Sequence, residues 1–255
     1  MRADRRTPDA EAYGPELAYV HEAGFSGFAR LAAPALLRIL HEHRVEGGLV
    51  VDVGCGTGIW AAALLRAGYD VLGIDRSAAM IDRARRHVPA ARFEVAPLEE
   101  ITLPRCAAVT AIGETLSYAQ LPLRDFCLRV RDALDAGGVF IFDVAVPGEP
   151  YQGQWSGHDW QIFISQSVRG DLLTRRITTF RSVSGTTRRS DEVHELRIYE
   201  PEEIAATLQE TGFTAQTKRA YGRAQLPAAH LGFVAVRAQG PGPRAQAETT
   251  AERSP

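Results

Sequence analysis

The segment Leu49-Val50-Val51-Asp52-Val53-Gly54-Cys55-Gly56-Thr57-Gly58 decides the fold of this chain. Its first half is a short β-branched run, which is typical of a buried strand in a parallel sheet. The three glycines that follow let the backbone turn sharply and approach a ligand closely. The residues from Ile59 to Ala67 have a helical pattern that ends at Gly68. The segment therefore predicts a strand, a glycine turn and a helix whose free N–H groups face a polar ligand.

The same alternation of strand and helix extends on both sides of this unit. Helical spacing of apolar residues begins before it, and Ser77 is a typical N-cap for a later helix. Helices are predicted at 31–43, 59–67, 78–87 and 123–134, the last closed by Gly137-Gly138, and strands at 49–53, 70–74, 91–95, 107–112 and 139–144. Since parallel strands need crossover helices, this rhythm predicts an α/β fold with a doubly wound, mostly parallel sheet.

After Pro147 the pattern changes to extended segments without helices between them. Segments 160–168, 172–183 and 192–199 are predicted as an inserted antiparallel layer, with turns at Gly170-Asp171 and Gly185-Thr186. A helix at 201–211 and two closing strands at 213–219 and 231–237, forming a hairpin, return to the main sheet. We therefore expect a disordered N-terminus (1–12), an N-terminal helical cap (13–47), a core (48–147 and 200–238), an inserted lid (148–199) and a disordered tail (239–255).

Composition narrows the classes of function. The chain has 255 residues and a net charge of −2, so no basic field suggests nucleic acid or an anionic membrane as a partner. The three cysteines share no close spacing, which indicates neither a zinc site nor a disulfide framework. The first residues show no signal-peptide pattern and no segment is long and apolar enough to span a membrane, so we expect a cytoplasmic protein.

An acid at the end of the next predicted strand narrows the ligand. Asp75 lies 17 residues after Gly58, where a carboxylate can accept hydrogen bonds from ribose hydroxyls. Dinucleotide-binding turns have the spacing G-x-G-x-x-G, whereas this turn has glycines at 54, 56 and 58. The phosphate-loop pattern with its Lys-Ser/Thr pair is absent from the sequence. A nucleoside ligand other than a dinucleotide is therefore indicated.

Val51-Asp52-Val53-Gly54-Cys55-Gly56-Thr57-Gly58 resembles the first motif of the class I S-adenosylmethionine-dependent methyltransferases, an acid followed by G-x-G-x-G. Gly73-Ile74-Asp75-Arg76-Ser77 is similar to the family's second-strand segment, and Ala136-Gly137-Gly138-Val139-Phe140 to its glycine pair. The resemblance covers about residues 49–147. It implies a Rossmann-like seven-stranded sheet and S-adenosyl-L-methionine as cofactor, with no metal.

The resemblance also implies a set of cofactor contacts. The glycine turn faces the methionine portion, Asp75 the ribose, and Arg76, Met80 and Leu98 the adenine. The expected cofactor-binding residues are Tyr19, Asp52, Gly54, Cys55, Gly56, Gly58, Asp75, Arg76, Met80, Leu98 and Gly113. Two positions depart from the family pattern: Pro97 stands where an acid often contacts the adenine amino group, and Ala107 replaces an Asp.

The candidates for catalysis are His21, Glu114 and His194. Methyl transfer depends mainly on positioning, and a base is needed only when the acceptor carries a proton. His21 precedes the core and is a candidate base or a residue that caps the sheet edge. Glu114 is expected to line the acceptor pocket, together with Tyr118. A strand histidine such as His194 is more often a packed or surface residue, so its role as a base stays open.

The expected reaction is N- or O-methylation of a small-molecule acceptor by a monomer or homodimer. Two other classes of protein stay possible at this point. A non-catalytic S-adenosylmethionine-binding protein would have the same turn. A nicotinamide-dependent oxidoreductase is less compatible, because it needs the longer glycine spacing and usually a Tyr-x-x-x-Lys pair, and Lys218 is the only lysine.

Overall fold

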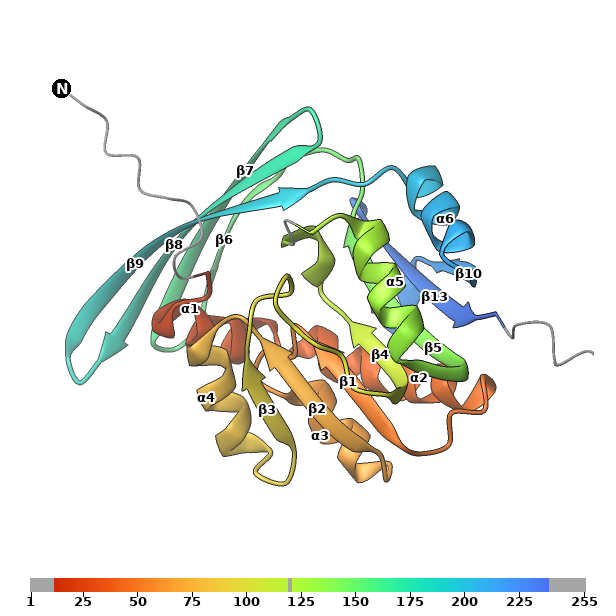
Figure 1. Ribbon diagram of the computed structural model, residues 1–255. Coiled ribbons are helices and arrows are strands. Elements are labelled where there is room, and N and C mark those ends of the chain that lie inside the picture. Colours follow the sequence, from red (N-terminus) through yellow and green to blue (C-terminus); the bar gives the residue numbers. More distant parts are fainter. Residues whose placement is uncertain (1–11, 119–120, 239–255) are drawn as a thin grey trace, which may run out of the picture.

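The computed structural model describes residues 12–118 and 121–238, and its centre is a seven-stranded sheet. The strand order is β10 (Phe213–Lys218), β13 (His230–Arg237), β5 (Leu134–Ala145), β4 (Cys106–Ala111), β1 (Leu49–Val53), β2 (Asp70–Asp75) and β3 (Arg92–Val95). The five strands from β5 to β3 are parallel, while β13 runs antiparallel to both β5 and β10 (Figure 1). The predicted mostly parallel, doubly wound fold is confirmed.

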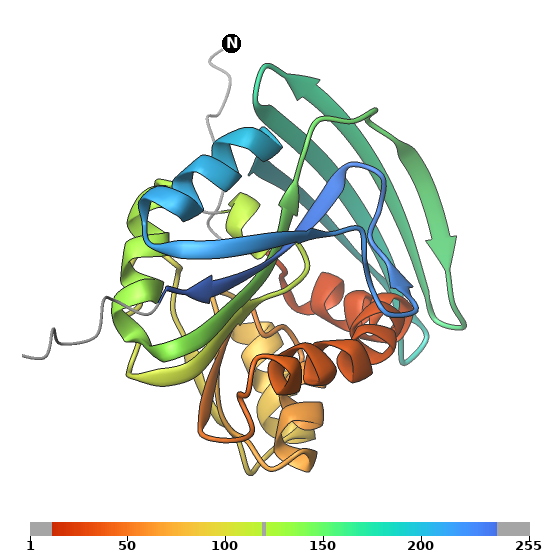
Figure 2. The same cartoon turned by 90° about the vertical axis from the view of Figure 1, so that its right-hand side faces the viewer.

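Helices cover both faces of this sheet (Figure 2). On one face lie α2 (Gly27–Glu42), α3 (Ile59–Arg66) and α4 (Ala78–His87), and on the other α5 (Leu123–Ala133) and α6 (Pro201–Glu210). Each layer has its own apolar core, the first around Leu36, Leu64 and Ile81 and the second around Phe126 and Phe140. Burial on both faces explains why the strands are nearly continuous apolar runs.

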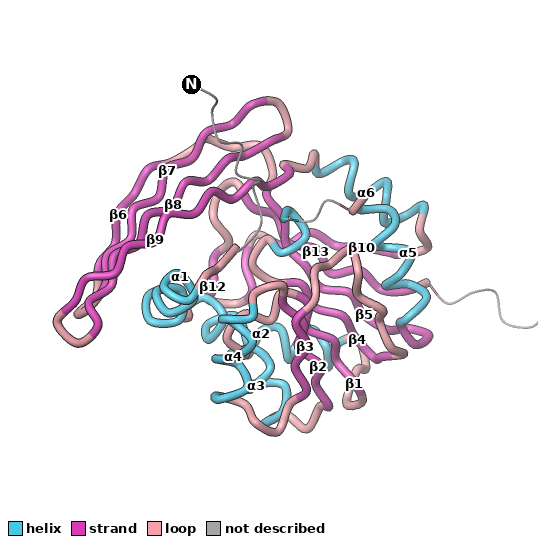
Figure 3. The backbone as a smooth tube through the Cα atoms, turned by 60° about the vertical axis from the view of Figure 1, so that its left-hand side comes forward, coloured by secondary structure: helices cyan, strands magenta, loops and turns pink. Residues whose placement is uncertain are grey.

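A second, four-stranded antiparallel sheet, here called the outer sheet, consists of β6 (Gln152–Ser156), β7 (Trp160–Arg169), β8 (Leu172–Val183) and β9 (Thr186–Arg197). Side chains alternate between its faces, as the period of a strand requires. In β8, Leu173, Arg175 and Ile177 are buried, while Arg176 between them is exposed. The outer sheet projects beside the main sheet (Figures 1 and 3).

The N-terminal segment fills the angle between the two sheets. It comprises α1 (Pro15–Val20) and a π-helix, η1 (His21–Phe25), and α1 contacts α4 on one side and β7, β8 and β9 on the other (Figure 3). Glu16 pairs with Arg181 and Arg188 of the outer sheet, and Glu22 pairs with Arg83 of α4. The segment therefore joins the outer sheet to the core.

Several local expectations differ from the structure. Helix α5 ends at Ala133, and Gly137-Gly138 lie within β5 instead of capping the helix. The predicted closing hairpin is present as the β10–β13 pair, but two short strands, β11 (Ala220–Tyr221) and β12 (Ala224–Gln225), lie between them. Helix α1 and η1 lie within the expected N-terminal helical cap and β6 within the expected inserted lid, although none of the three had bounds of its own in the prediction. The expected disorder at 1–12 and 239–255 falls, apart from Ala12, outside the described residues.

The described residues contain neither a single membrane-spanning helix nor a cluster that could bind a metal ion. No single helix there is long and apolar enough to cross a membrane. Only the bent pair Pro15–Phe25 and Gly27–Glu42, at 64° to each other, has the length and composition of a membrane span when the two helices are taken together. Among the same residues no cluster of three His, Cys, Asp or Glu side chains is placed to hold a metal ion.

The glycine turn between β1 and α3 is tied to the end of β2. The backbone N–H groups of Gly54 and Cys55 both donate to the carbonyl oxygen of Ile74, at 2.7 and 3.1 Å. The N–H of Gly56 donates to Oδ2 of Asp75 at 2.9 Å. All three glycines have positive φ, which glycine adopts without steric cost. The turn and the second strand therefore form one unit.

Alanine substitutions at Gly54 and Gly56 distinguish the cost of a left-handed backbone from that of a steric clash. Both Gly54→Ala and Gly56→Ala incur the left-handed backbone cost of about 1–2 kcal/mol. At Gly54 an added Cβ would also lie 2.2 Å from Oγ1 of Thr115, whereas nothing lies within 4 Å at Gly56. We expect Gly54→Ala to lower the free energy of unfolding in urea more than Gly56→Ala does. Equal losses would contradict the close approach of Thr115 to the turn.

Candidate functional site

A cavity of about 470 Å³ lies at the carboxyl ends of the parallel strands. The glycine turn, the end of β2 and the loop after β4 form its floor, and the N-terminal segment and the outer sheet cover it. This position lies between β1 and β4, where the strand order reverses, and ligands of open α/β sheets bind at that point.

Asp75 and the glycine turn form one end of the cavity. The Asp75 carboxylate accepts hydrogen bonds from the backbone N–H groups of Gly56 and Ser77, both at 2.9 Å. Burial raises the pKa of Asp75, and these two donors oppose the shift. Gly56 has open space where a Cβ would stand, so its backbone is accessible from the cavity. A carboxylate and an exposed backbone are thereby presented together to a ligand.

Asp52 lies at the end of β1 and also borders the cavity. A hydrogen-bonded chain holds it: Nε1 of Trp60 donates to Oγ1 of Thr110 at 3.1 Å, and that hydroxyl donates to Asp52 Oδ1 at 2.8 Å. Burial raises the pKa of Asp52 to about 7 despite the Thr110 donor. This carboxyl group therefore titrates near neutral pH.

The loop after β4 is held in an uncommon conformation. Gly113 and Glu114 both have positive φ, of 89° and 55°. Their backbone N–H groups donate to the carboxylate of Asp143 on β5, at 3.0 Å for Gly113 and 2.7 Å for Glu114. Strained residues persist when surrounding contacts determine them. Asp143 therefore fixes the direction in which Glu114 points.

Glu114 is buried between the side chains of Arg175 and His230. Its Oε1 lies 2.6 Å from Nη1 of Arg175, and its Oε2 lies 3.1 Å from Nε2 of His230. Burial alone raises the pKa of Glu114, but Arg175 and His230 outweigh it and hold the pKa at about 2. A carboxylate with so low a pKa is a poor proton acceptor at neutral pH. Glu114, predicted as catalytic, is therefore placed to orient a neighbour.

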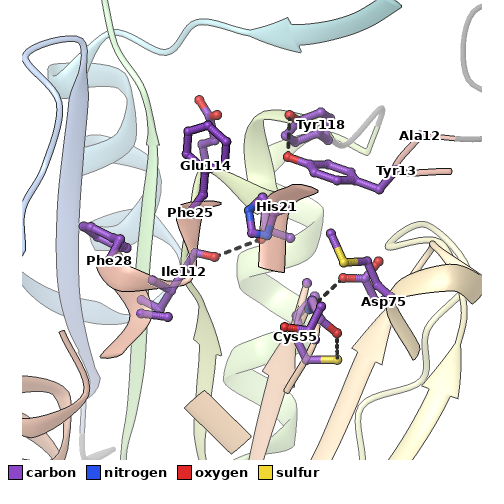
Figure 4. Close-up of a pocket in the computed structure, with 18 of the residues that line it drawn as sticks. Ala12, Tyr13, His21, Phe25, Phe28, Cys55, Asp75, Ile112, Glu114 and Tyr118 are labelled. Atoms are coloured by element: carbon purple, nitrogen blue, oxygen red, sulfur yellow. Dashed lines mark hydrogen bonds between the residues drawn. The ribbon is translucent and has the colours of Figure 1, made fainter. Parts of the chain in front are cut away.

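A buried chain of polar groups leads from the cavity into the outer sheet. The hydroxyl groups of Tyr13 and Tyr118 lie 3.3 Å apart and face each other (Figure 4), and the Tyr118 hydroxyl is 3.4 Å from Nδ1 of His194. His194 Nε2 lies 2.8 Å from Glu192, whose carboxylate accepts the backbone N–H groups of Tyr13 and Gly14. Tyr13 has a φ of 61°, so Glu192 holds a strained residue in place.

His21 reaches the cavity from the π-helix. Such helices often occur at functional sites, since the extra residue redirects side chains. Burial lowers the pKa of His21 to about 4, so its imidazole is neutral at pH 7. The remaining surface on this side is mostly apolar, and its side chains come from η1, α2, the loop after β4 and the outer sheet: Phe25, Phe28, Ile112, Ile162, Ile164 and Ile177.

Most of the residues singled out from the sequence lie around this one cavity. They are His21, Asp52, Gly54, Cys55, Gly56, Asp75, Arg76, Met80, Leu98, Gly113 and Glu114, with Tyr118 beside them. The structure thus joins residues of the N-terminal segment, three strand ends and one loop.

Three predicted residues do not line this cavity. Tyr19, expected to contact the cofactor, donates its hydroxyl to Asp159 at 2.7 Å and packs against the guanidinium group of Arg181. Gly58 starts α3 with a φ of 79° and packs against α4, so its role is in the backbone turn. His194 is 2% exposed and lies behind Tyr13 and Tyr118, which separate it from the cavity.

The residues that line the cavity and were not singled out from the sequence include Tyr13, Glu99, Asp143, Arg175 and His230. In β8, Arg175 is buried while its neighbour Arg176 is exposed, and no short sequence pattern distinguishes the two. His230 is the first residue of β13, and no local spacing links it to Glu114. Glu99 lies two residues after Pro97, which stands where the family often has an acid.

The chain is similar to known proteins across this region. Residues 50–138 match the model of a family described as a methyltransferase domain. A ubiquinone biosynthesis O-methyltransferase of Alkalilimnicola ehrlichii is 32% identical over 166 residues, which are 56% of this chain and 65% of that protein. Protein arginine N-methyltransferase 1 of Dictyostelium discoideum is 32% identical over 136 residues, 49% of this chain and 40% of the relative. Both matches span less than two thirds of the relative's length.

Solved structures show the same fold. The sugar N-methyltransferase KedS8 from Streptoalloteichus has a TM-score of 0.75 at 22% identity, covering 93% of this chain and 99% of that one. An S-adenosylmethionine-dependent methyltransferase from Clostridium acetobutylicum also has a TM-score of 0.75, at 16% identity, covering 87% and 97%. Together with the first-motif turn and the cavity beside it, these similarities show that residues 50–138 match a methyltransferase domain and that the described part of the chain has the fold of S-adenosylmethionine-dependent methyltransferases.

Proposed function

We propose that this protein transfers the methyl group of S-adenosylmethionine to a small-molecule acceptor. The observation that carries the proposal is the single cavity that joins the glycine turn and Asp75 at one end to Glu114 and His230 at the other. Bound S-adenosylmethionine supplies an electrophilic methyl group on a sulfonium. The residues of the chain hold the two reactants in line and keep water out, and such positioning contributes much of the rate of a two-substrate reaction.

The cofactor end of the cavity fits a nucleoside joined to an amino acid. We propose that Asp75 accepts the ribose hydroxyls and that the exposed backbone at Gly56 and Gly113 follows the methionine portion. Arg76, Met80 and Leu98 border the adenine, as the family resemblance implies. Glu99 also lines this end, and we assign it the adenine amino group in place of the acid missing at Pro97.

The acceptor end of the cavity is mostly apolar, with Glu114, Arg175 and His230 as its polar groups. Enclosed pockets of a few hundred Å³ with few polar groups suit small molecules. The net charge of −2 gives no attraction for nucleic acid. Relatives that act on ubiquinone precursors and on sugars make both hydroxyl and amino groups candidate nucleophiles.

A nicotinamide-dependent oxidoreductase gains no support, because the family and the relatives named above are methyltransferases. A non-catalytic cofactor-binding protein is distinguished from the proposed enzyme only by turnover. A cytoplasmic location and a monomeric or homodimeric state stay predictions from the sequence.

Asp75→Ala tests the cofactor site. Loss of a carboxylate that accepts ribose hydroxyls should weaken binding of S-adenosylhomocysteine by about 1–3 kcal/mol, the scale of hydrogen bonds to a charged group. Isothermal calorimetry measures this, with Asp70→Ala as control, because Asp70 is exposed at the other end of β2. Unchanged affinity in Asp75→Ala, or equal losses in both variants, would place the ribose elsewhere.

The titration of Asp52 predicts how binding depends on pH. The ionised form attracts the ammonium group of the ligand's methionine portion, and the pKa of Asp52 is raised to about 7. Affinity for S-adenosylhomocysteine should therefore rise severalfold between pH 6 and pH 8, where the carboxyl group loses its proton. Calorimetry over this range should show a flatter dependence for Asp52→Asn. An identical dependence of affinity on pH in both proteins would exclude Asp52 as the source of that dependence.

A screen with radiolabelled S-adenosylmethionine tests the reaction itself. Primary amines including amino sugars, and phenols including catechols, are incubated with the wild-type chain, and methylated products are separated and counted. We expect transfer to at least one compound and none to DNA or RNA. Cofactor binding without transfer to any compound would contradict the proposed enzyme and favour a binding protein.

A further inference from the structure

His230 occupies a defined place at the acceptor end of the cavity. It begins β13, where its backbone pairs with Ala145 at the end of β5, and its side chain lines the cavity. The last turn before it is closed by a hydrogen bond from its own N–H to the carbonyl oxygen of Pro227 at 2.9 Å. The imidazole therefore projects from a backbone fixed on two sides.

Glu114 determines the protonation of this imidazole. His230 Nε2 lies 3.1 Å from Glu114 Oε2, the separation of an ion pair, and a carboxylate can only accept a hydrogen. The carboxylate beside Nε2 favours a hydrogen on that nitrogen in neutral His230, which leaves the lone pair of Nδ1 to receive a proton. Glu114 stays in this position because Arg175 binds its other oxygen and Asp143 binds its backbone.

The charges around His230 favour its protonated form. Burial lowers its pKa, but the hydrogen bond to Glu114 and the charges of Glu114 and Asp143 outweigh burial and the opposing charge of Arg175. The net direction is a raised pKa. Glu114 after β4, Asp143 on β5 and Arg175 on β8 are the charged groups that face it.

The other histidines near the cavity are poorer bases. Burial lowers the pKa of His21 to about 4, so it holds a proton weakly at neutral pH. His194 lies behind Tyr118 and does not line the cavity. His230 alone among these three combines access to the cavity with an oriented, ionised carboxylate, which is the arrangement of a general base and its orienting acid.

We propose that His230, oriented by Glu114, is the general base that receives the acceptor's proton, an inference that rests on the proposed methyl transfer. The acceptor is then a molecule whose nucleophile carries a proton at neutral pH, a phenol or an alkylammonium. The nucleophilic atom forms its bond to the methyl carbon while the carbon–sulfur bond breaks and its electron pair goes to sulfur. The proton of the nucleophile passes to Nδ1 of His230, and the imidazolium formed is stabilised by Glu114. For an alkylammonium this proton transfer comes before the new bond forms, because its nitrogen has no lone pair until it has lost that proton.

The first test is a titration that needs no acceptor. The imidazole signals of the free protein are followed by proton–carbon NMR between pH 4 and 9 and assigned with His230→Gln and His21→Gln. We expect His230 to titrate above the ordinary value of about 6.5 and His21 below it. In Glu114→Gln the pKa of His230 should fall. A His230 pKa at or below the ordinary value in the wild-type protein would overturn the pairing with Glu114, whether or not Glu114→Gln folds.

The second test uses the amine or phenol that gives turnover in the screen. His230→Gln should lower kcat by about 100-fold to 10,000-fold, the contribution of general base catalysis, with little change in affinity for S-adenosylhomocysteine. Added imidazole should restore part of the activity of His230→Ala. His41→Gln, with a side chain 75% exposed, is the control and should behave as wild type.

The outcomes separate the inference from the proposed function. Full activity in His230→Gln, or a loss that imidazole does not restore in a folded His230→Ala that still binds S-adenosylhomocysteine, would overturn His230 as the base while methyl transfer stands. Absence of turnover by the wild-type protein with every amine and phenol contradicts the proposed function, and the base with it. An amine or a phenol as the active compound decides between N- and O-methylation.

Discussion

The hydrogen bonds that tie the glycine turn to the end of β2 are the constraint on which the rest of the site depends. Gly54 and Cys55 donate to Ile74, and Gly56 donates to the neighbouring Asp75. The acid that we propose to bind the ribose is therefore also the acid that holds the turn. A change at either position moves both, which explains how a strand, a turn and a separate carboxylate act as one binding surface.

The acceptor side is built differently, from parts distant in the sequence. Asp143 on β5 fixes the loop that carries Glu114, and Glu114 then joins Arg175 of the outer sheet to His230 at the start of β13. A buried carboxylate is costly to separate from the guanidinium group that pairs with it. The outer sheet is thus held to the core by the same group that orients the proposed base.

A second set of hydrogen bonds holds the N-terminal segment over the cavity. Glu192 of β9 accepts the backbone N–H groups of Tyr13 and Gly14, and Tyr13 in turn lies against Tyr118 after β4. The N-terminal segment is therefore bonded both to the outer sheet and to the core. The N-terminal segment and the outer sheet therefore cover the cavity, and electrostatic interactions are stronger where protein replaces water around them.

The sequence predicted best where the signal is local. The turn at Gly54, the N-cap at Ser77, whose hydroxyl accepts the N–H of Met80, and the position of Asp75 depend on neighbours a few residues apart. The proposed acceptor end depends on contacts between strands whose register no short pattern encodes. A shift of one residue in β8 distinguishes Arg175 from Arg176.

The lack of a sequence signal for distant contacts also explains why Tyr19 was predicted in the cavity and Tyr13 was not. Tyr19 was expected at the cofactor, but α1 turns it toward Asp159, while Tyr13, with its left-handed backbone, enters the cavity. The backbone of Tyr13 is held by Glu192, and a contact between segments so distant in the chain has no sequence signature.

The central claim is that one cavity holds the cofactor on Asp75 with its sulfur facing Glu114 and His230. A crystal structure of the complex with S-adenosylhomocysteine tests this most directly. The account predicts both ribose hydroxyls within hydrogen-bonding distance of the Asp75 carboxylate and the sulfur directed toward the Glu114–His230 pair. A ribose bound away from Asp75, or a sulfur directed away from that pair, would contradict it.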